Sequence, residues 1–361
     1  MSSNESRTID VRAEDTFDLA ALATWLGEMG ILITGEISVR QFKGGASNLT
    51  YLISDSDDNK YVLRTPPHGT KAVSAHDMGR EARVLSALSP NLKQAPKVMG
   101  FCNDHSVLGR DFYLMEYVKG HILASEVPLE VCPDADSVRA LCESMVDSLA
   151  ALHRVDIHAT GLVDMDKGPG YVGRQVSGWS KRYRAARTTD VPDAEEIMDW
   201  LNANQPPDVS HVLIHGDWRF DNLVIDDHAK IIGILDWEMS TIGDPCMDLG
   251  AALSYWVQAD DPADFRSLRL QPTDQLGMLT RAEVVERYGN AMTQEVRDSL
   301  ERNWLFYEVF GLFRLAVIIQ QIWARYSSGA STNPQFTGYG AAVNMLINRA
   351  IRCLGVSGNG N

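Results

Sequence analysis

The chain has 361 residues, a length that allows two domains or one large two-lobed unit. It carries 33 Lys and Arg against 48 Asp and Glu, so its formal net charge is −15. An acidic excess of this size argues against general binding of nucleic acids or anionic membranes, because both require a basic surface. With 22% charged and 45% hydrophobic residues, the composition is that of a folded globular protein.

The cysteines and the apolar stretches exclude further classes. Five cysteines are scattered without any CxxC spacing, which suggests neither a disulfide framework nor a zinc site. The first six residues lack the basic and apolar regions of a signal peptide. The most apolar stretch, 304–323, is interrupted by Glu, Arg and Gln, so we expect no transmembrane helix there. These features predict a soluble, reduced protein of the cytoplasm.

The first part of the chain shows the alternating apolar pattern of strands. After a short amphipathic helix at 18–29, strands are predicted at 31–42, 49–53 and 61–64, with a hairpin turn at 54–59. Helical spacing follows at 71–88, and then apolar runs at 97–101 and 112–118. The first 118 residues are therefore expected to form a small sheet with one inserted helix.

The remainder of the chain, 119–361, is expected to be mainly helical, with long helices at 136–153 and 295–326. Short strands predicted at 212–225 and 230–235 interrupt it. Residues 161–189 contain glycines and much positive charge, and we expect a mobile, loop-like segment there.

The most informative segment for chemistry contains His215-Gly216-Asp217, with Asn222 after four intervening residues. A following strand ends at Asp236. Two strands joined by a tight loop can bring Asp217, Asn222 and Asp236 to one end of a hairpin. Carboxylate and amide oxygens suit Mg²⁺, and one of the carboxylates can orient a hydroxyl and accept its proton.

The pattern His-Gly-Asp-x4-Asn, followed by a strand ending in Asp, resembles the aminoglycoside phosphotransferase and choline-kinase-like family, relatives of protein kinases. The string from Leu235 to Leu249, LDWEMSTIGDPCMDL, most resembles the branch that is fused to an acyl-CoA dehydrogenase in some proteins. The resemblance implies an α+β, two-lobed protein-kinase-like fold that uses ATP and Mg²⁺. Residues 1–118 would form the nucleotide-binding lobe, and 119–361 the helical lobe with the catalytic loop and the acceptor site.

The resemblance also implies roles for individual residues. Asp217 would be the catalytic base that orients the acceptor hydroxyl, while Asn222 and Asp236 would hold Mg²⁺. Three further residues would support the site structurally, by holding the loop and capping the next helix: His215, Asp244 and Asp248.

The nucleotide is expected in the first lobe. Small residues at 43–48 would let backbone N–H groups approach phosphate closely. Kinases of this superfamily pair a strand lysine with a helix glutamate. Here Arg64 stands at the lysine position, and arginine is not a neutral replacement. The strand at 112–118 resembles the hinge that binds adenine through its backbone. The expected nucleotide-binding residues are Gly44, Gly45, Ser47, Asn48, Arg64, Glu81, Glu116 and Val118, with ATP or GTP left open.

The acceptor is expected to be a small molecule, because Asp244 follows Asp236 too soon to leave room for a peptide-docking segment. Residues 167–189 hold six basic and no acidic side chains, which favours an anionic acceptor such as a hydroxyacyl-CoA-type compound. It is equally plausible that these basic residues only form a helix face that is exposed to solvent. The candidate acceptor-binding residues are Arg174, Gln175, Trp179 and Lys181.

Two other functions stay open at this stage. A true aminoglycoside O-phosphotransferase would share the same motif. A nucleotide-binding pseudokinase is supported only by the arginine at the lysine position, and the intact Asp217, Asn222 and Asp236 oppose it. The expected partners are therefore a nucleotide and a small hydroxyl compound, with no nucleic acid and no membrane, and the oligomeric state is open.

Overall fold

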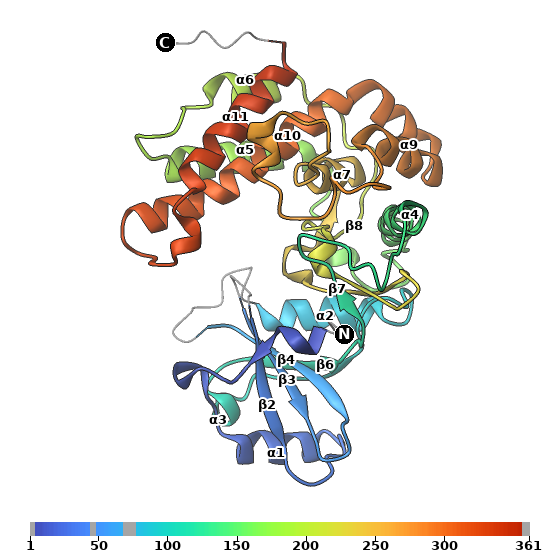
Figure 1. Cartoon of the computed structure of the whole chain (residues 1–361), viewed down its shortest axis with the longest axis vertical. Helices are drawn as coiled ribbons and strands as arrows, with labels where there is room; N and C mark the ends of the chain where they lie inside the picture. The colour runs from blue at the N-terminus through green and yellow to red at the C-terminus, as the bar shows by residue number, and fades with distance from the viewer. Residues whose placement is uncertain (1–3, 44–47, 68–76, 356–361) are drawn as a thin grey trace. The chain divides into compact units, whose positions relative to one another are not determined.

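The computed structural model of the chain describes residues 4–43, 48–67 and 77–355. It divides into two compact units of discontinuous sequence (Figure 1). The first unit comprises the chain up to Ile122 together with His158–Leu162 and Asp221–Ser240. The second unit comprises Leu123–Ile157, Val163–Phe220 and the chain from Thr241 onward.

The first unit is built on an antiparallel sheet of six strands in the order β1-β2-β3-β4-β6-β5. A tight turn joins β3 to β4, as the sequence predicts, and Arg64 of β4 lies opposite Tyr113 of β6. The predicted strand at 31–42 is shorter in the structure and starts at Ser38. The strands span Thr8–Ile9 (β1), Ser38–Phe42 (β2), Leu49–Ser54 (β3), Lys60–Thr65 (β4), Val98–Cys102 (β5) and Phe112–Glu116 (β6).

The core of this unit lies between one face of the sheet and helix α1 (Leu19–Glu28). Alternate strand residues such as Tyr51, Ile53 and Leu63 point to that face because strand side chains have a period of two. They pack against Leu22 and its neighbours on the helix. Fully burying one such side chain contributes roughly 1.5–3 kcal/mol. The short helix α3 (His105–Leu108) packs beside α1.

Helix α2 (Met78–Leu88) packs against strands β5 and β6. It begins where Asp77 caps the N–H of Arg80, at 2.9 Å. The predicted helix at 71–88 is therefore found in its second half, and 71–76 lies outside the described residues. A second, three-stranded sheet completes the unit in the order β10-β9-β7. Its strands are His121–Ile122 (β7), Leu223–Ile225 (β9) and Ile231–Ile234 (β10).

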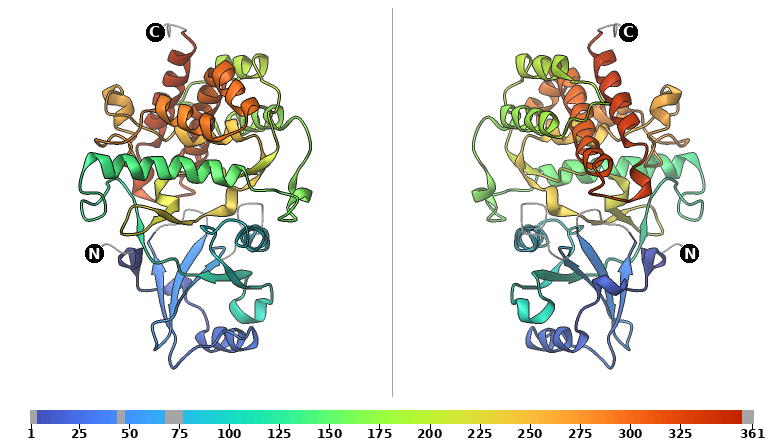
Figure 2. Two further views of the ribbon diagram at one scale, coloured as in Figure 1. Left: turned by 90° about the vertical axis from the view of Figure 1, so that its right-hand side faces the viewer. Right: turned by 90° about the vertical axis from the view of Figure 1, so that its left-hand side faces the viewer.

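The second unit is mainly helical, which together with the sheet-based first unit confirms the predicted α+β, two-lobed class. Among its described residues it holds one strand pair, β8 (Val212–Ile214) with β11 (Thr241–Gly243). The long helices α10 and α11 run side by side (Figure 2). The principal helices are Ala135–His153 (α4), Tyr171–Ala186 (α5), Glu195–Ala203 (α6), Pro245–Leu253 (α7), Arg281–Ala291 (α9), Gln294–Ser327 (α10) and Tyr339–Cys353 (α11).

Residues 161–189 are not the loop-like segment that the sequence predicts, because most of them form α5. The glycines lie ahead of the helix, and the apolar residues Val172, Val176, Trp179 and Tyr183 then follow at intervals of four, three and four. This spacing places them on one helix face, and all four are buried.

Helix α10 is long and apolar enough to cross a membrane by length and composition, but 67% of its most apolar window is buried within the fold. It approaches α7 very closely. A Cβ added to Gly311 would lie 2.1 Å from the carbonyl oxygen of Gly250, and one added to Gly250 would lie 2.4 Å from that of Tyr307. Only glycine permits this contact between the two helix backbones.

Candidate functional site

The loop that follows strand β8 carries the predicted catalytic base. Gly216 adopts a left-handed conformation with φ 80°, which favours glycine. Both polar groups of its backbone are bonded to buried charged side chains. Its N–H donates to Asp248 Oδ1 at 2.9 Å, and its carbonyl accepts from Arg314 Nη2 at 2.5 Å. Helices α7 and α10 therefore fix the residue directly before Asp217.

Asp217 is partly accessible, with its side chain 20% exposed. Its Oδ1 lies 3.2 Å from Nε of Arg219, which in turn lies over the ring of Tyr255. Its backbone N–H donates to His215 Nδ1 at 3.2 Å. A carboxylate held in this way, and still reachable by solvent, can accept a hydrogen bond from an acceptor hydroxyl.

The predicted supporting residue Asp248 is fully buried at the start of α7. Its Oδ2 accepts the backbone N–H of His215 at 3.0 Å and faces His153 Nε2 at 3.1 Å. Burial opposes the charged form, but the hydrogen bonds from His153 and from the backbone hold the pKa of Asp248 below its usual range. The carboxylate therefore stays ionised and continues to accept the backbone N–H groups of His215 and Gly216.

Asp244, the other predicted supporting carboxylate, caps helix α7. Its Oδ1 accepts the N–H groups of Cys246 and Met247 at 2.9 and 3.2 Å, and its Oδ2 accepts that of Val209 at 2.7 Å. Burial raises the pKa of Asp244, while these backbone hydrogen bonds act in the opposite direction. It ties the segment ahead of β8 to the helix that carries Asp248.

In the first unit, Arg64 is the centre of a group of carboxylates. Its Nη2 lies 2.9 Å from Asp236 Oδ1, 3.5 Å from Glu81 Oε1 and 3.8 Å from Glu238 Oε2. Burial alone would lower the pKa of Arg64, but these carboxylates raise it well above the ordinary value. Burial raises the pKa of Glu81, which is 1% exposed, against the opposing charge of Arg64. The predicted pair of strand arginine and helix glutamate is therefore present in the structure.

Asn48, at the end of the predicted phosphate loop, is buried and donates to Glu238 Oε2 at 2.8 Å. Gly44, Gly45 and Ser47 lie outside the described residues. Arg80 of α2 donates to the backbone carbonyl of Glu238 at 3.1 Å and also to that of Ser240. The segment after Asp236 is thus fastened to the sheet and to α2.

The predicted metal ligands Asn222 and Asp236 lie on neighbouring segments of the first unit. The N–H of Leu235 donates to the carbonyl of Asn222 at 2.8 Å, which brings the next residue, Asp236, close to Asn222. Asp236 adopts φ 66° and ψ 62°, a left-handed conformation that costs a non-glycine residue of order 1–3 kcal/mol. Such strain is typical of functional positions.

These two side chains fit Mg²⁺, which takes one or two carboxylates together with waters and phosphate oxygens. Asn222 supplies an amide oxygen, and the carboxylate of Asp236 is 32% exposed. Within 4–43, 48–67 and 77–355, no three His, Cys, Asp or Glu side chains form a metal cluster by themselves. A metal at this position would therefore need the amide, water or phosphate oxygens as further ligands.

The predicted hinge residues Glu116 and Val118 lie at and beyond the end of β6. The N–H of Glu116 donates to the carbonyl of Lys97 at 2.9 Å. Asn4, near the N-terminus, donates from Nδ2 to the carbonyl of Val118 at 2.8 Å and from its backbone to that of Gly120 at 3.0 Å. The hydroxyl of Tyr117 also donates to Asn4 Oδ1. The N-terminal segment thus restrains the hinge.

The predicted acceptor residues all lie on α5, where three of them have local hydrogen-bond partners. Arg174 donates to the carbonyls of Gly168 and Pro169 at 2.7 and 2.5 Å. Gln175 accepts the indole N–H of Trp179 at 3.1 Å. Lys181 is exposed.

Trp179 itself is buried, and two guanidinium groups lie over its ring. That of Arg182 is 4.6 Å from the ring centroid, and that of Arg314 is 5.1 Å away. Through Arg314, the structure connects α5 to the carbonyl of Gly216. Two positive charges therefore gather near the loop that carries Asp217.

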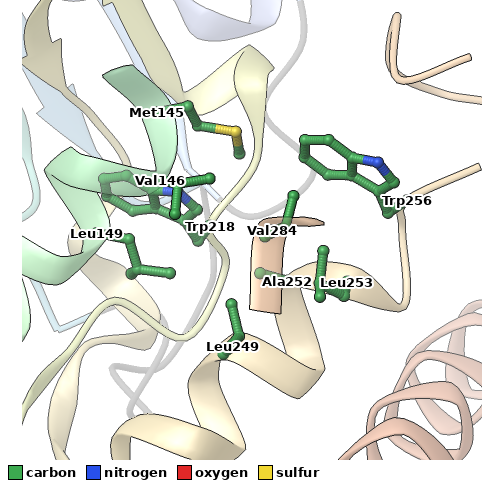
Figure 3. Close-up of a pocket in the computed structure, with 9 residues that line it drawn as sticks. All are labelled: Met145, Val146, Leu149, Trp218, Leu249, Ala252, Leu253, Trp256 and Val284. Carbon is green, nitrogen blue, oxygen red and sulfur yellow. The ribbon is translucent and has the colours of Figure 1, made fainter. Parts of the chain in front are cut away.

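A small apolar pocket lies beside this loop in the second unit (Figure 3). Trp218, the residue after Asp217, and Trp256 lie on opposite sides of it in this view. The indole N–H of Trp218 is buried and has no acceptor among the residues that the structure describes. The other lining residues come mainly from α4, α7 and α9: Met145, Val146, Leu149, Leu249, Ala252, Leu253 and Val284.

The sequence reasoning missed several residues of the site. Arg219 and Glu238 each stand two positions after a predicted site carboxylate, and that proximity was the available signal. Arg314 is a charged residue within an apolar stretch of helix α10, and this unusual position was the available signal for it. His153 and Asn4 give no signal in the sequence, because only the fold brings them to the loop and to the hinge.

Comparisons with known proteins agree with this arrangement. A sequence model described as "Phosphotransferase enzyme family" matches residues 38–284. Acyl-CoA dehydrogenase family member 10 of Mus musculus is 37% identical over 311 residues. That match covers 85% of this chain, which spans only 28% of the length of the mouse protein.

Solved structures show the same likeness. A Ralstonia eutropha protein, provisionally described as an aminoglycoside phosphotransferase, matches with a TM-score of 0.78 and 31% identity, over 94% of this chain and 98% of that one. A thermostable aminoglycoside phosphotransferase bound to AMP-PNP and hygromycin B matches with a TM-score of 0.58, over 95% and 100% of the two chains. At 14% identity, this second likeness shows the fold alone.

Proposed function

Because the chain belongs to the phosphotransferase enzyme family and is a small-molecule phosphotransferase of kinase-like fold, we propose that it transfers the γ-phosphoryl group of ATP to a hydroxyl of a small anionic molecule. The observation that carries the proposal is the fixed position of Asp217. The two residues before it are held by the buried Asp248, and Gly216 is held by Arg314 as well. Rigid placement of the reacting group is what phosphoryl transfer requires of a protein.

The second unit would orient the acceptor. Asp217 accepts a hydrogen bond from the hydroxyl and takes up its proton as the oxygen attacks phosphorus. Arg219, 3.2 Å from Asp217, offers a positive charge to offset the charge that develops on the transferring group. Because Asp248 is itself fixed, the carboxylate of Asp217 does not have to reorganise during the reaction.

The first unit would hold the nucleotide. Arg64 offers a permanent charge and a fork of N–H donors for phosphate oxygens, while Glu81 keeps that side chain in place. The backbone of Glu116 and Val118 would bind adenine. Asn222 and Asp236 would hold Mg²⁺, which when bound neutralises charge on the β- and γ-phosphates.

The choice of an anionic acceptor rests on the charges beside Trp179. Arg182 and Arg314 both lie over its ring, and Arg314 also contacts the catalytic loop. A polycationic aminoglycoside would be repelled by these groups. The mouse relative is an acyl-CoA dehydrogenase family member by name, which supports a hydroxyacyl-CoA-type compound as the acceptor.

The test is a screen for ADP release across hydroxylated metabolites, including hydroxyacyl-CoAs, hydroxy acids and aminoglycosides. We expect transfer to an anionic member of the panel, and loss of that transfer in Asp217→Asn with nucleotide binding kept. Transfer to aminoglycosides instead would overturn the acceptor class. Near-full activity of Asp217→Asn would overturn the role of Asp217.

A further inference from the structure

A buried chain of polar side chains connects helix α9 with the catalytic loop. The hydroxyl of Tyr288 lies 2.5 Å from His153 Nδ1, and His153 Nε2 lies 3.1 Å from Asp248 Oδ2. Asp248 accepts the N–H groups of His215 and Gly216. Tyr288, His153 and Asp248 are at most 2% exposed, so water does not replace these contacts. This series of hydrogen bonds ends at Gly216, one residue before Asp217.

The chemistry of Tyr288, His153 and Asp248 determines which of them donates each hydrogen bond. An ionised carboxylate can only accept hydrogen bonds, so His153 must carry its hydrogen on Nε2, toward Asp248. In the neutral imidazole, Nδ1 then has a lone pair and needs a donor. Tyr288 is that donor, because burial raises the pKa of its hydroxyl well above the ordinary value and keeps it protonated.

A small apolar pocket lies beside these polar residues. The pocket of Figure 3 is lined by the neighbours of the same polar residues. Val284 and Leu149 stand one helical turn before Tyr288 and His153, and Leu249 and Trp218 directly follow Asp248 and Asp217. The series of hydrogen bonds from Tyr288 through His153 to Asp248 runs beside this pocket and connects α9 with the loop.

We propose that Tyr288 is a positioning residue of the phosphotransferase, which acts by holding His153 in the Nε2–H tautomer. In the other tautomer, His153 would turn a lone pair toward the carboxylate of Asp248. The two would repel each other, and Asp248 would lose its orientation toward the backbone of His215 and Gly216. This inference rests on the proposed function, since it assigns Tyr288 to the placement of Asp217.

The first test compares Tyr288→Phe with Tyr307→Phe. Tyr307 is a matched control, because it is also fully buried, while its hydroxyl lies 2.7 Å from Ser299 Oγ and not on His153. We expect Tyr288→Phe to lower kcat by roughly 10–100-fold, the effect of a small misplacement of a reacting group, with an unchanged KM for ATP. Tyr307→Phe should leave kcat within about twofold.

A spectroscopic measurement separates positioning from mere stability. In protein with ¹⁵N-labelled histidine, the ring of His153 should report one Nε2–H tautomer in the wild type and in Tyr307→Phe. In Tyr288→Phe it should report a mixture. This readout needs no acceptor, so it can fail or succeed independently of the proposed function.

A double-mutant cycle with His153→Gln gives a second criterion, since glutamine has no tautomers. If Tyr288 acts through the tautomer of His153, adding Tyr288→Phe to His153→Gln should change kcat by less than about threefold. Full additivity of the two losses, or a single tautomer of His153 in Tyr288→Phe, would overturn the proposal.

Discussion

Nη2 of Arg64 lies 2.9 Å from Oδ1 of Asp236 and 3.5 Å from Oε1 of Glu81, so one nitrogen serves both carboxylates. Asp236 is also the residue that we expect to hold Mg²⁺. The arginine that stands in place of the usual lysine therefore neutralises the metal ligand as well as the helix glutamate. Its longer side chain places this one nitrogen between the two carboxylates.

From this relationship we predict that Arg64→Met destabilises the protein by about 3–5 kcal/mol, because it leaves the buried carboxylate of Glu81 without its partner. Chemical denaturation measures the loss. Arg64→Lys should keep most of the stability, since the charge remains. Combining Arg64→Met with Glu81→Gln should recover a large part of the lost stability, because the unpaired charge at position 81 is then removed. If Arg64→Met alone were as stable as the wild type, the pair would have no structural role.

The acceptor side can be tested on helix α5 with two arginines two positions apart. Arg182 lies over Trp179, whereas Arg184 forms an ion pair with Glu195 at 2.5 Å. We predict that Arg182→Gln raises KM for an anionic acceptor by roughly 3–10-fold without changing KM for ATP, and that added salt weakens the difference. Arg184→Gln should have no effect on either constant. Equal effects of the two substitutions would mean that only the net charge of the helix matters.

The N-terminus of α5 gives a prediction about pH. Oδ1 and Oδ2 of Asp208 accept the N–H groups of the first turn, at Gly170, Tyr171 and Val172. His211 lies between Asp166 and Asp208, and its hydrogen bond with Asp166 raises its pKa from the ordinary 6.5, although partial burial opposes this.

Because the pKa of His211 is higher in the folded state, protonated His211 adds stability below about pH 6.5, and this contribution is lost as the pH rises through the folded pKa. We therefore expect the thermal midpoint to fall between pH 6.5 and mildly alkaline pH. His211→Gln should flatten that part of the profile. The hydrogen-exchange protection factors of residues 170–172, which are corrected for the intrinsic rise of exchange with pH, should fall over the same range in the wild type but not in His211→Gln. A profile unchanged by the substitution would assign the pH dependence to another group.

Periodicity and spacing were enough to predict much of this fold. The β3–β4 hairpin and the helices α4 and α10 follow from apolar patterns that tertiary contacts do not override, whereas the two-lobed kinase-like class followed from the resemblance to the family. The helix α5 was predicted only as one of two readings of residues 167–189, because the glycines before Tyr171 and the dense positive charge obscured the apolar spacing that follows.

The site was predictable only where its residues are close in sequence. Asp217, Asn222 and Asp236 could be recognised because the loop and strands fix their spacing. His153 and Tyr288 could not be recognised, because His153 stands 95 positions before Asp248 and Tyr288 stands 40 positions after it, each on a different helix. Contacts of this kind depend on how helices pack, which local patterns do not encode.

The close contact of α7 with α10 gives the last prediction. A Cβ at Gly311 would lie 2.1 Å from the carbonyl oxygen of Gly250, so the helices would have to separate in Gly311→Ala. Gly311 stands one turn before Arg314, whose guanidinium holds the carbonyl of Gly216. We therefore expect Gly311→Ala to lose stability and phosphotransfer together, measured by thermal denaturation and by kcat. Gly27→Ala is the control, because nothing lies within 4 Å of its added Cβ. Gly27 lies in the last turn of α1, so this substitution should leave stability and kcat close to those of the wild type. If Gly311→Ala kept full activity despite reduced stability, the hydrogen bond from Arg314 to Gly216 would not be needed to place Asp217.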